Sequence, residues 1–296
     1  MPVGSISSPS TNGFDVGPFT IHLYGLTILL AIVAAVALIG YRWTRRGGDW
    51  DLVLRAALWG VLAGLVGARA YHLITSWDQD PAIHQHWWGP FAIWKGGLGV
   101  WGGILFGCAA GAIVVKRAGV SVLEFMDVAA PGLLLAQGVG RWGNYFNQEL
   151  YGRPTSLPWG LKIDPEHRVQ GYQQFSTFHP TFLYEFIWDL LMVGVLLLVD
   201  RRFRIKPPAL FALYVAAYTA FRTFEETLRI DPSHYFLGQR VNFWVSLLLF
   251  VGSAAFFIWW QFFHRTGGEE KRPASLPPAP KGPAMAIPRG RVRSGR

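Results

Sequence analysis

The chain alternates long apolar runs with short polar connections as far as residue 263. A helix of roughly 20 apolar residues crosses about 30 Å of hydrocarbon, and seven runs approach that length. They predict membrane-spanning helices at residues 21–41, 53–74, 98–115, 122–140, 180–199, 208–228 and 240–263. The expected fold is therefore all-α, a polytopic membrane helix bundle with about seven transmembrane helices.

Composition and the first apolar run agree with a membrane protein. Hydrophobic residues make up 51% of the 296 residues and charged residues 15%, whereas soluble domains carry about 25% charged residues. The run at 21–41 is longer than the core of a signal peptide and follows no basic segment, so we expect it to remain as a membrane anchor. The single cysteine, Cys108, rules out an intrachain disulfide and a Cys-rich metal site.

Basic residues in the connections predict the orientation of the bundle. They follow the first, third and fifth predicted helices, at Arg42, Arg45, Arg46, Lys116, Arg117, Arg201, Arg202, Arg204 and Lys206. The connection at 75–94 contains Asp78 and Asp80 but no Lys or Arg. Because basic loops stay in the cytoplasm, we expect the N-terminus outside and the C-terminus in the cytoplasm.

The chain is expected to have three parts. Residues 1–20 form an extracytoplasmic N-terminal segment, and residues 21–263 form the transmembrane domain. Within that domain, the turn-rich segment 144–179 predicts a small extracytoplasmic cap. Residues 264–296 are basic and rich in Pro and Gly, so we expect a disordered cytoplasmic tail that is attracted to anionic lipid. This tail and the cytoplasmic loops account for the net charge of +9, so nucleic-acid binding is not expected.

Charged and amide side chains gather at the ends of two predicted helices. The run from Arg141 to Glu149 follows an uncharged stretch, and Tyr218, Arg222 and Glu226 share one helix face at i, i+4 and i+8. An isolated charge at the centre of a span costs about 2.5–3.5 kcal/mol, so these groups must be paired, hydrated or near the interface. Simple neutralisation of Arg222 by Glu226 is an alternative, but it leaves Arg141 and Glu149 unexplained.

A glycine-rich stretch opens the third predicted helix. Residues 96–103 contain Gly97 and Gly102, and glycines allow close approach either of a ligand or of another helix. The sequence leaves both interpretations open. There is no P-loop, because neither Lys95 nor Lys116 stands in the strand-to-helix context of that motif.

The run from Gly140 to Glu149, continued by Tyr151-Gly152-Arg153, resembles the signature of the prolipoprotein diacylglyceryl transferase family. The resemblance covers roughly residues 18 to 263. Further similarities occur at Tyr24-Gly25, Gly67, Arg69, the glycines of the third helix, Asp127, Pro131, His179-Pro180-Thr181, Leu183-Tyr184-Glu185, and Tyr218 through Arg222, Glu226 and Arg229 to Asp231-Pro232.

The resemblance implies a transferase of the bacterial cytoplasmic (inner) membrane, active at its outer face. Such an enzyme moves the diacylglyceryl group of phosphatidylglycerol to the thiol of a lipobox cysteine, at the signal peptide of a prolipoprotein. Glycerol phosphate leaves and a thioether forms. The expected partners are therefore phosphatidylglycerol, the prolipoprotein and the lipid bilayer, with no metal or cofactor.

This chemistry assigns roles to the polar residues. Guanidinium groups suit a phosphate leaving group, and a carboxylate can take the thiol proton. The expected catalytic residues are Arg141, Arg222, Glu226 and Glu149, with either glutamate as the base. The expected substrate-binding residues are Tyr24, Asn144, Asn147, Gly152, Tyr218, Arg229, Gly97 and Gly102.

One position departs from the family pattern. Many members carry a His-Gly-Gly triplet whose histidine has been assigned as the base, and this chain has Trp101-Gly102-Gly103. An indole accepts no proton, so that role does not transfer to Trp101. His179 is a weaker substitute and His72 weaker still. Asp127 and Glu185 are expected either to pair with Arg69 or Arg141 or to act in catalysis.

Other classes of membrane protein compete with this interpretation. A transporter or channel also buries charged pairs, but it predicts inverted repeats with broken helices, which the chain lacks. An enzyme that uses another lipid donor or acceptor fits the same residues. A structural scaffold has little use for buried arginines.

Overall fold

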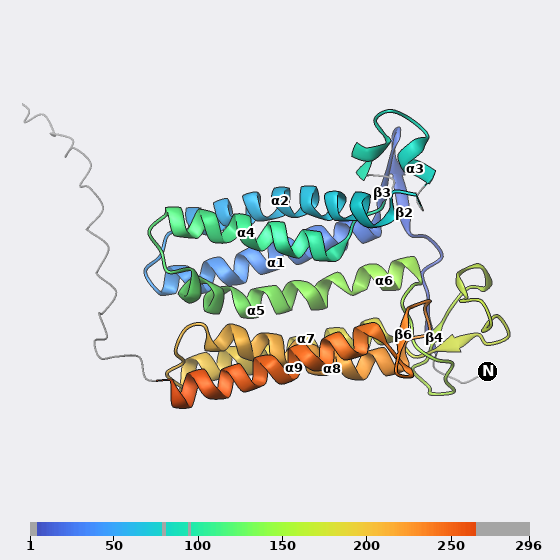
Figure 1. The fold of residues 1–296 in the computed structure, drawn as a ribbon. Coiled ribbons are helices and arrows are strands. Elements are labelled where there is room, and N and C mark those ends of the chain that lie inside the picture. The colour runs from blue at the N-terminus through green and yellow to red at the C-terminus, as the bar shows by residue number, and fades with distance from the viewer. Residues whose placement is uncertain (1–4, 79–80, 94–95, 265–296) are drawn as a thin grey trace, which may run out of the picture. The chain divides into compact units, whose positions relative to one another are not determined.

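The computed structural model describes residues 5–78, 81–93 and 96–264, so the predicted tail at 264–296 lies outside the described residues except for its first residue. Helices dominate this part of the chain (Figure 1). They are α1 (Leu23–Arg45), α2 (Trp50–Ser76), α3 (Pro81–His84), η1 (Gly89–Phe91), α4 (Val100–Arg117), α5 (Val122–Gly140), α6 (Trp142–Asn147), η3 (Pro165–His167), α7 (Thr181–Arg202), α8 (Ala209–Leu228), α9 (Val241–Ile258) and η4 (Trp259–Phe263).

Six helical stretches of the described chain are long and apolar enough to cross a membrane: α1, α2, α4, α5 with α6, α7, and α9 with η4. α8 has 20 residues, which is long enough for about 30 Å, but its second half carries Arg222, Glu225 and Glu226. Each of the seven predicted ranges therefore coincides with one helix, and six are confirmed as long apolar helices.

Side-chain caps explain where two of the helices begin. The Asp49 carboxylate accepts a hydrogen bond from the N–H of Asp51 at the start of α2, at 3.0 Å. The Ser121 hydroxyl accepts one from the N–H of Glu124 at the start of α5, at 3.4 Å. These caps satisfy N–H groups that have no partner within the helix.

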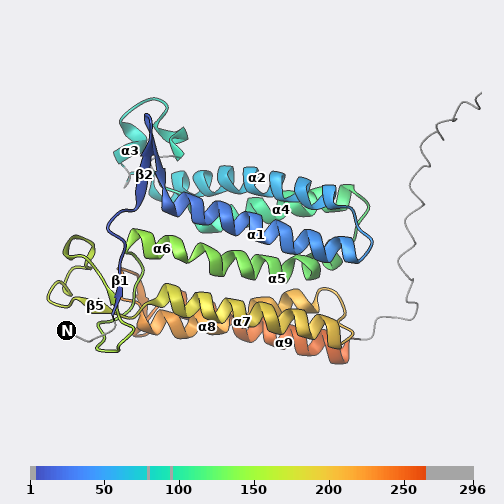
Figure 2. The ribbon, with the colours of Figure 1, turned by 180° about the vertical axis from the view of Figure 1, so that it is seen from behind.

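The helices form a layered bundle (Figures 1 and 2). α2 and α4 lie on one side, α7, α8 and α9 lie on the other, and α1 and α5 lie between them. One apolar core joins Ile39 and Val53 to Val128, and a second joins Leu134 to Leu210. The bundle therefore buries side chains along its length, while α5 connects its two sides.

Short strands gather at one end of the bundle (Figure 1). A three-stranded sheet has the order β1 (Ile6–Ser7), β4 (Leu161–Lys162) and β5 (Thr177–Phe178), with β1 parallel to β4 and β4 antiparallel to β5. Two antiparallel hairpins pair β2 (Gly13–Val16) with β3 (Phe19–His22) and β6 (Tyr235–Phe236) with β7 (Gln239–Arg240). Ile163 and Phe178 are fully buried in a small core that also includes Phe182 of α7. The cluster described next lies at this end.

Candidate functional site

Two arginines from distant parts of the chain bind one buried glutamate. Arg141 stands between α5 and α6, and its Nη2 lies 2.6 Å from Oε1 of Glu185 in α7. Arg222 of α8 places Nη1 3.5 Å from Oε2 of the same carboxylate. Arg141 Nη2 also donates to the hydroxyl of Tyr218 at 3.4 Å. Glu185 is completely buried, so it joins three helices through an ion-paired centre.

Glu226 connects this centre to the end of the bundle. Arg222 contacts both Glu225 and Glu226, so the predicted i,i+4 pair is confirmed as part of a larger cluster. Oε1 of Glu226 also lies 3.5 Å from Arg229 Nη1, and Oε2 accepts a hydrogen bond from Arg240 Nε at 2.7 Å. Three arginines therefore hold the two oxygens of Glu226.

Asp231 closes the cluster at its outer edge. Arg229 Nε donates to Oδ1 at 2.7 Å, and Arg240 Nη2 donates to Oδ2 at 2.8 Å. Arg240 Nη1 also donates to the Asp231 backbone carbonyl at 2.6 Å. Burial opposes ionisation of Asp231, but the hydrogen bonds and charges of both arginines outweigh it and hold the pKa of this carboxyl below its usual range.

We name these side chains the arginine cluster: Arg141, Arg222, Arg229, Arg240, Glu185, Glu225, Glu226 and Asp231. With every member ionised, the cluster is formally neutral. Each guanidinium is already aimed at carboxylate oxygens, which share hydrogen-bonding geometry with phosphate oxygens. The arrangement can therefore bind an anion by rearranging existing contacts.

A second polar group lies around the end of α6. Asn144 Nδ2 donates to Oε1 of Glu149 at 3.0 Å, and Asn147 Nδ2 approaches the same oxygen at 3.4 Å. Glu149 is exposed, and its Oε2 forms no hydrogen bond with the described residues. Tyr24 of α1 interacts electrostatically with Glu149 and Arg141. A Cβ on Gly143 would collide with the Tyr24 ring, so glycine allows this approach.

The turn after α6 directs Glu149 back toward Asn144. Gln148 adopts a left-handed conformation with φ 51°, which is unfavourable for a residue with a side chain. Three hydrogen bonds hold it: Nε2 donates to Asp164 Oδ2 at 2.7 Å and to the Pro9 carbonyl at 3.2 Å, and Oε1 accepts from the Asp164 N–H at 2.8 Å. The strand-containing end therefore positions Glu149 through Gln148.

Gly152 lies where the chain returns to the bundle. Its N–H donates to the His179 carbonyl at 2.9 Å, and it forms a β-bridge with Arg229. A Cβ at this position would lie 2.9 Å from the His179 Cβ, so a larger residue would push the segment away from α7. Gly152 thus brings Arg229 and the region after α6 together by close backbone packing.

The glycines of the third predicted helix lie elsewhere. Gly102 packs on the Gly67 carbonyl, where a Cβ would collide, as close helix packing requires. Gly97 lies against the side chains of Arg69 and His72. No contact described for these glycines reaches the arginine cluster, and α4 lies on the far side of α1 and α5 from α8 (Figure 1). Their role in substrate binding stays a prediction.

Glu185 and Asp127, the two carboxylates expected to pair with Arg69 or Arg141 or to act in catalysis, make different contacts in the structure. Glu185 pairs with Arg141, as one expectation had it. Asp127 instead accepts a hydrogen bond from the Phe211 N–H at 2.8 Å, at the start of α8. Arg69 donates to backbone carbonyls, those of Gly89, Pro90, Gly96 and Gly97. It therefore holds the segment before α4 against α2.

Sequence reasoning missed three members of the site. Glu225 follows Arg222 at i+3, so helical spacing alone could have indicated it. Arg240 follows the β6–β7 hairpin, and no spacing relates it to Glu226. Gln148 belongs to the predicted polar run, but its unusual backbone conformation leaves no mark in the sequence. Within the described residues, no group of three or more His, Cys, Asp and Glu is placed to hold a metal ion.

Comparison with known proteins identifies the family. The family model described as prolipoprotein diacylglyceryl transferase matches residues 12–259. A relative from Frankia alni named phosphatidylglycerol–prolipoprotein diacylglyceryl transferase is 47% identical over 253 residues, which cover 86% of this chain and 67% of the relative. A relative of the same name from Cutibacterium acnes is 46% identical, and the match covers 90% of this chain and 90% of the relative. Another, from Mycobacteroides abscessus, is 42% identical, and the match covers 86% of this chain and 78% of the relative. Because both kinds of match span nearly all of the helical region, the chain belongs to the prolipoprotein diacylglyceryl transferase family.

Proposed function

We propose that this protein transfers the diacylglyceryl group of phosphatidylglycerol to the thiol of a lipobox cysteine in a prolipoprotein. The observation that carries the proposal is the meeting of Arg141 and Arg222 at Glu185, beside the polar run at 140–153. Buried guanidinium groups at the end of an apolar bundle suit a lipid with an anionic headgroup. The names of the relatives supply the two substrates.

The reaction breaks one bond and forms one bond. The cysteine sulfur attacks the glycerol carbon that carries the phosphate, a C–S bond forms, and the C–O bond to the phosphate breaks. The electron pair of that bond goes to the phosphate oxygen, so negative charge accumulates there. The thiol proton goes to a base, and glycerol phosphate leaves.

Arg141 and Arg222 stabilise the leaving phosphate. Both side chains are largely buried and already ion-paired with Glu185, so little reorganisation precedes binding. Arg229 and Tyr218 extend the same donor surface, since Arg229 contacts Glu226 and Tyr218 contacts Arg141. Glu185 holds the two central arginines in position until the phosphate arrives.

Glu149 is the better placed of the two expected bases. Both oxygens of Glu226 already contact arginines, so Glu226 acts by holding Arg222, Arg229 and Arg240. Glu149 is exposed, and Asn144 and Asn147 engage only its Oε1. Its Oε2 is therefore the oxygen that accepts the thiol proton, while Tyr24 and the two asparagines orient the headgroup.

The site faces the outside of the bacterial inner membrane. α8 is the sixth of the seven spans in chain order, and its charged second half lies at the end of the bundle that carries the strands. The basic residues in and directly after the last turns of α1, α4 and α7 lie at the opposite end of these helices, so that end is cytoplasmic by the positive-inside rule. The segment at 144–179 then forms an extracytoplasmic cap, and the N-terminus lies outside.

The test is a transfer assay with the full-length protein in phosphatidylglycerol vesicles. A peptide with a lipobox cysteine is supplied, and mass spectrometry follows thioether formation while released glycerol phosphate is measured. Both products are expected in equal amounts. Phosphatidylcholine vesicles and a peptide with serine in place of cysteine are the controls. Folded protein that makes neither product would overturn the assignment.

A further inference from the structure

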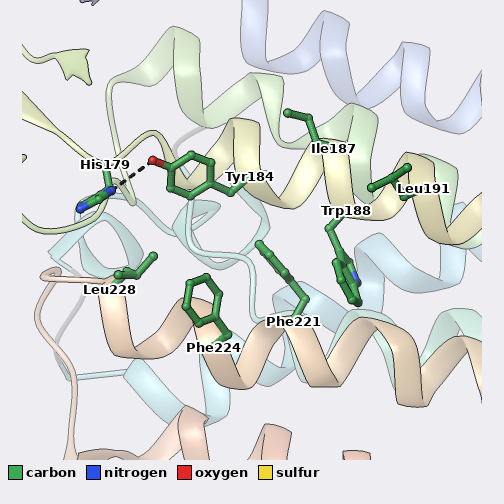
Figure 3. Close-up of a pocket in the computed structure, with 8 residues that line it drawn as sticks. All are labelled: His179, Tyr184, Ile187, Trp188, Leu191, Phe221, Phe224 and Leu228. Atoms are coloured by element: carbon green, nitrogen blue, oxygen red, sulfur yellow. Dashed lines mark hydrogen bonds between the residues drawn. The ribbon is translucent and has the colours of Figure 1, made fainter. Parts of the chain in front are cut away.

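An apolar groove runs between α7 and α8, on a different face of α8 from the arginine cluster. Phe221, Phe224 and Leu228 line it at i, i+3 and i+7, whereas Arg222 and Glu226 point to the cluster. Its volume is about 450 Å³, which is within the range of small-molecule sites. Figure 3 shows Trp188 of α7 reaching toward Phe221 of α8, with Phe224 and Leu228 extending from α8 on the same side.

The groove has a floor and a defined depth. Trp188 of α7 stacks on Phe221, with the ring centroids 5.4 Å apart, and Leu191 is the last lining residue along α7. From Thr181 to Leu191 a helix rises about 15 Å, half of the roughly 30 Å hydrocarbon core. Phe224 is 54% exposed, so the groove opens toward the surrounding lipid.

Polar groups gather at the mouth of the groove. Trp159 Nε1 donates to the Tyr184 hydroxyl at 3.1 Å, and that hydroxyl lies 3.1 Å from His179 Nδ1 (Figure 3). An indole N–H can only donate, so the Tyr184 hydroxyl accepts from Trp159, and its hydrogen bond with His179 Nδ1 runs in either direction according to the tautomer of the ring. Burial lowers the pKa of His179, which favours the neutral ring. Nε2 of the His179 ring has no hydrogen-bond partner among the described residues.

A cation stands beside the same mouth. The Arg153 N–H donates to the Leu228 carbonyl at 2.8 Å, and the Arg153 carbonyl accepts from the His179 N–H at 3.0 Å. Arg153 is exposed, and within the described residues its guanidinium has no carboxylate partner or hydrogen bond. An unpaired guanidinium next to an apolar groove complements a phosphate group linked to an acyl chain.

We propose that this groove binds one anionic phospholipid from the leaflet on the side of the arginine cluster. One acyl chain lies along Phe224 and Leu191 above the Trp188–Phe221 floor. The phosphate meets Arg153, and His179, as the tautomer protonated at Nε2, donates to an ester or phosphate oxygen while its Nδ1 accepts from Tyr184. This site is separate from the transfer site, and its occupation does not depend on the proposed reaction.

The depth of the groove favours a lipid acyl chain over a signal-peptide helix as its occupant. A signal-peptide helix needs about 20 residues to cross the full hydrocarbon core, and it would extend well beyond Leu191. An acyl chain of a single leaflet matches the half-core depth. The exposed charge of Arg153 also selects an anionic headgroup over a zwitterionic one.

The experiment labels the groove with a photoreactive lipid. Full-length protein is reconstituted in phosphatidylcholine vesicles that contain phosphatidylglycerol with a diazirine within one acyl chain. After irradiation, mass spectrometry locates the labelled residues. Labels are expected on α7 and α8 at Ile187, Leu191 and Phe224. A phosphatidylcholine probe with the same chain is expected to label them about fivefold less, the ratio for one basic residue near an anionic headgroup.

Two variants test the contacts of the acyl chain and of the headgroup separately. Leu228→Trp fills the groove and is expected to abolish labelling there, whereas Leu248→Trp adds the same bulk at an exposed position of α9 and leaves it unchanged. Arg153→Gln is expected to reduce phosphatidylglycerol labelling to the level of phosphatidylcholine. Retained labelling of α9 shows that each variant is folded and inserted.

Several outcomes overturn the proposal. Equal labelling by both probes would show that the groove only contacts the surrounding lipid. Loss of labelling when a lipobox peptide is added would show that the groove binds the peptide. Cross-links between two copies of the protein would show that the groove is a dimer contact. Glu149→Gln keeps the groove intact, so it is expected to stop transfer and retain labelling. Transfer without selective labelling overturns only the groove, and selective labelling without transfer overturns only the proposed function.

Discussion

Arg141 Nη2 lies 2.6 Å from Glu185 Oε1, and this ion pair joins the α5–α6 junction to α7 at a fully buried carboxylate. A buried carboxylate is costly unless it is paired and hydrogen-bonded. Glu185 is ion-paired on both oxygens, because Arg222 approaches its Oε2, although its Oε1 has no hydrogen bond among the described residues. The two arginines therefore depend on one side chain for their relative placement.

We expect Glu185→Gln to impair both turnover and stability. The amide keeps the shape of the side chain but removes the charge that two arginines share. Breaking a buried pair costs about 3–5 kcal/mol, so the thermal midpoint in detergent should fall, and transfer should drop more than tenfold, about 1.4 kcal/mol in the barrier. Asp51→Asn removes an exposed carboxylate of a surface pair and is the control. Wild-type turnover in Glu185→Gln would show that the Glu185 carboxylate has no role in the reaction.

Arg240 is expected to act through Glu226 and Asp231. Its three hydrogen bonds, at 2.6–2.8 Å, fix both carboxylates relative to α8. Arg240→Met should lower kcat about tenfold or more with a smaller change in KM, because the substrate contacts other arginines. Arg240→Lys should restore only part of kcat, since an ammonium group lacks the fork geometry. Arg55→Gln, at an exposed pair, should leave kcat unchanged. Equal activity of Arg240→Met and wild type would contradict this role.

The helices were predictable because apolar runs of membrane-spanning length leave a direct mark in the sequence. The seven predicted ranges match seven helices to within a few residues. The family motif indicated the polar run at 140–153, and helical spacing indicated Arg222 with Glu226. What could not be predicted is how helices far apart in sequence pair across the bundle.

Two pairings illustrate this limit. Arg240 reaches Glu226 only because the β6–β7 hairpin turns the chain back, and a hairpin places side chains by three-dimensional geometry that helical periodicity does not encode. A glycine in the sequence is ambiguous for a different reason. Close packing of two helices and close approach of a ligand both require a residue without a side chain. For Gly102 the structure shows packing on Gly67, whereas the sequence allowed both interpretations.

Trp101→Ala is expected to retain a measurable transfer rate. Trp101 is 54% exposed, in the first turn of α4, and an indole cannot accept the thiol proton. Glu149→Gln should lose most of the rate, because the Glu149 carboxylate is the proposed acceptor. The pair of variants is compared in the lipobox assay under saturating lipid. A larger loss in Trp101→Ala than in Glu149→Gln would move the proton acceptor away from the end of α6.

Asp231 should make the stability of the protein depend on acid pH. Its pKa is lower in the folded state than the ordinary value of about 3.9. Its contribution is therefore fully present above about pH 4 and is lost as pH falls through the lower folded-state pKa. The thermal midpoint in detergent, measured from neutral pH to below pH 4, should fall less steeply in Asp231→Asn than in wild type. Parallel curves for the two proteins would contradict the contribution of Asp231.

Asp189 offers a matched contrast to Glu185, one turn further along α7. Both carboxyls are completely buried, but Glu185 is ion-paired with Arg141 and Arg222, whereas within the described residues neither oxygen of Asp189 has a hydrogen-bond partner. An unsatisfied buried polar group costs about 1–3 kcal/mol, so the native structure gains nothing from this carboxyl. Asp189→Leu replaces it with an apolar side chain of similar length and should keep or raise the thermal midpoint.

The two variants are best measured side by side, since they share a helix and a depth. Glu185→Gln should unfold at a lower temperature and transfer slowly, while Asp189→Leu should match wild type in turnover. A drop in turnover for Asp189→Leu with an unchanged midpoint would mean that the Asp189 carboxyl acts on the arginine cluster through the electrostatic interactions it has with Glu185 and Arg141. Equal destabilisation of both variants would mean that burial alone, and not pairing with arginine, decides what a carboxyl contributes at this depth.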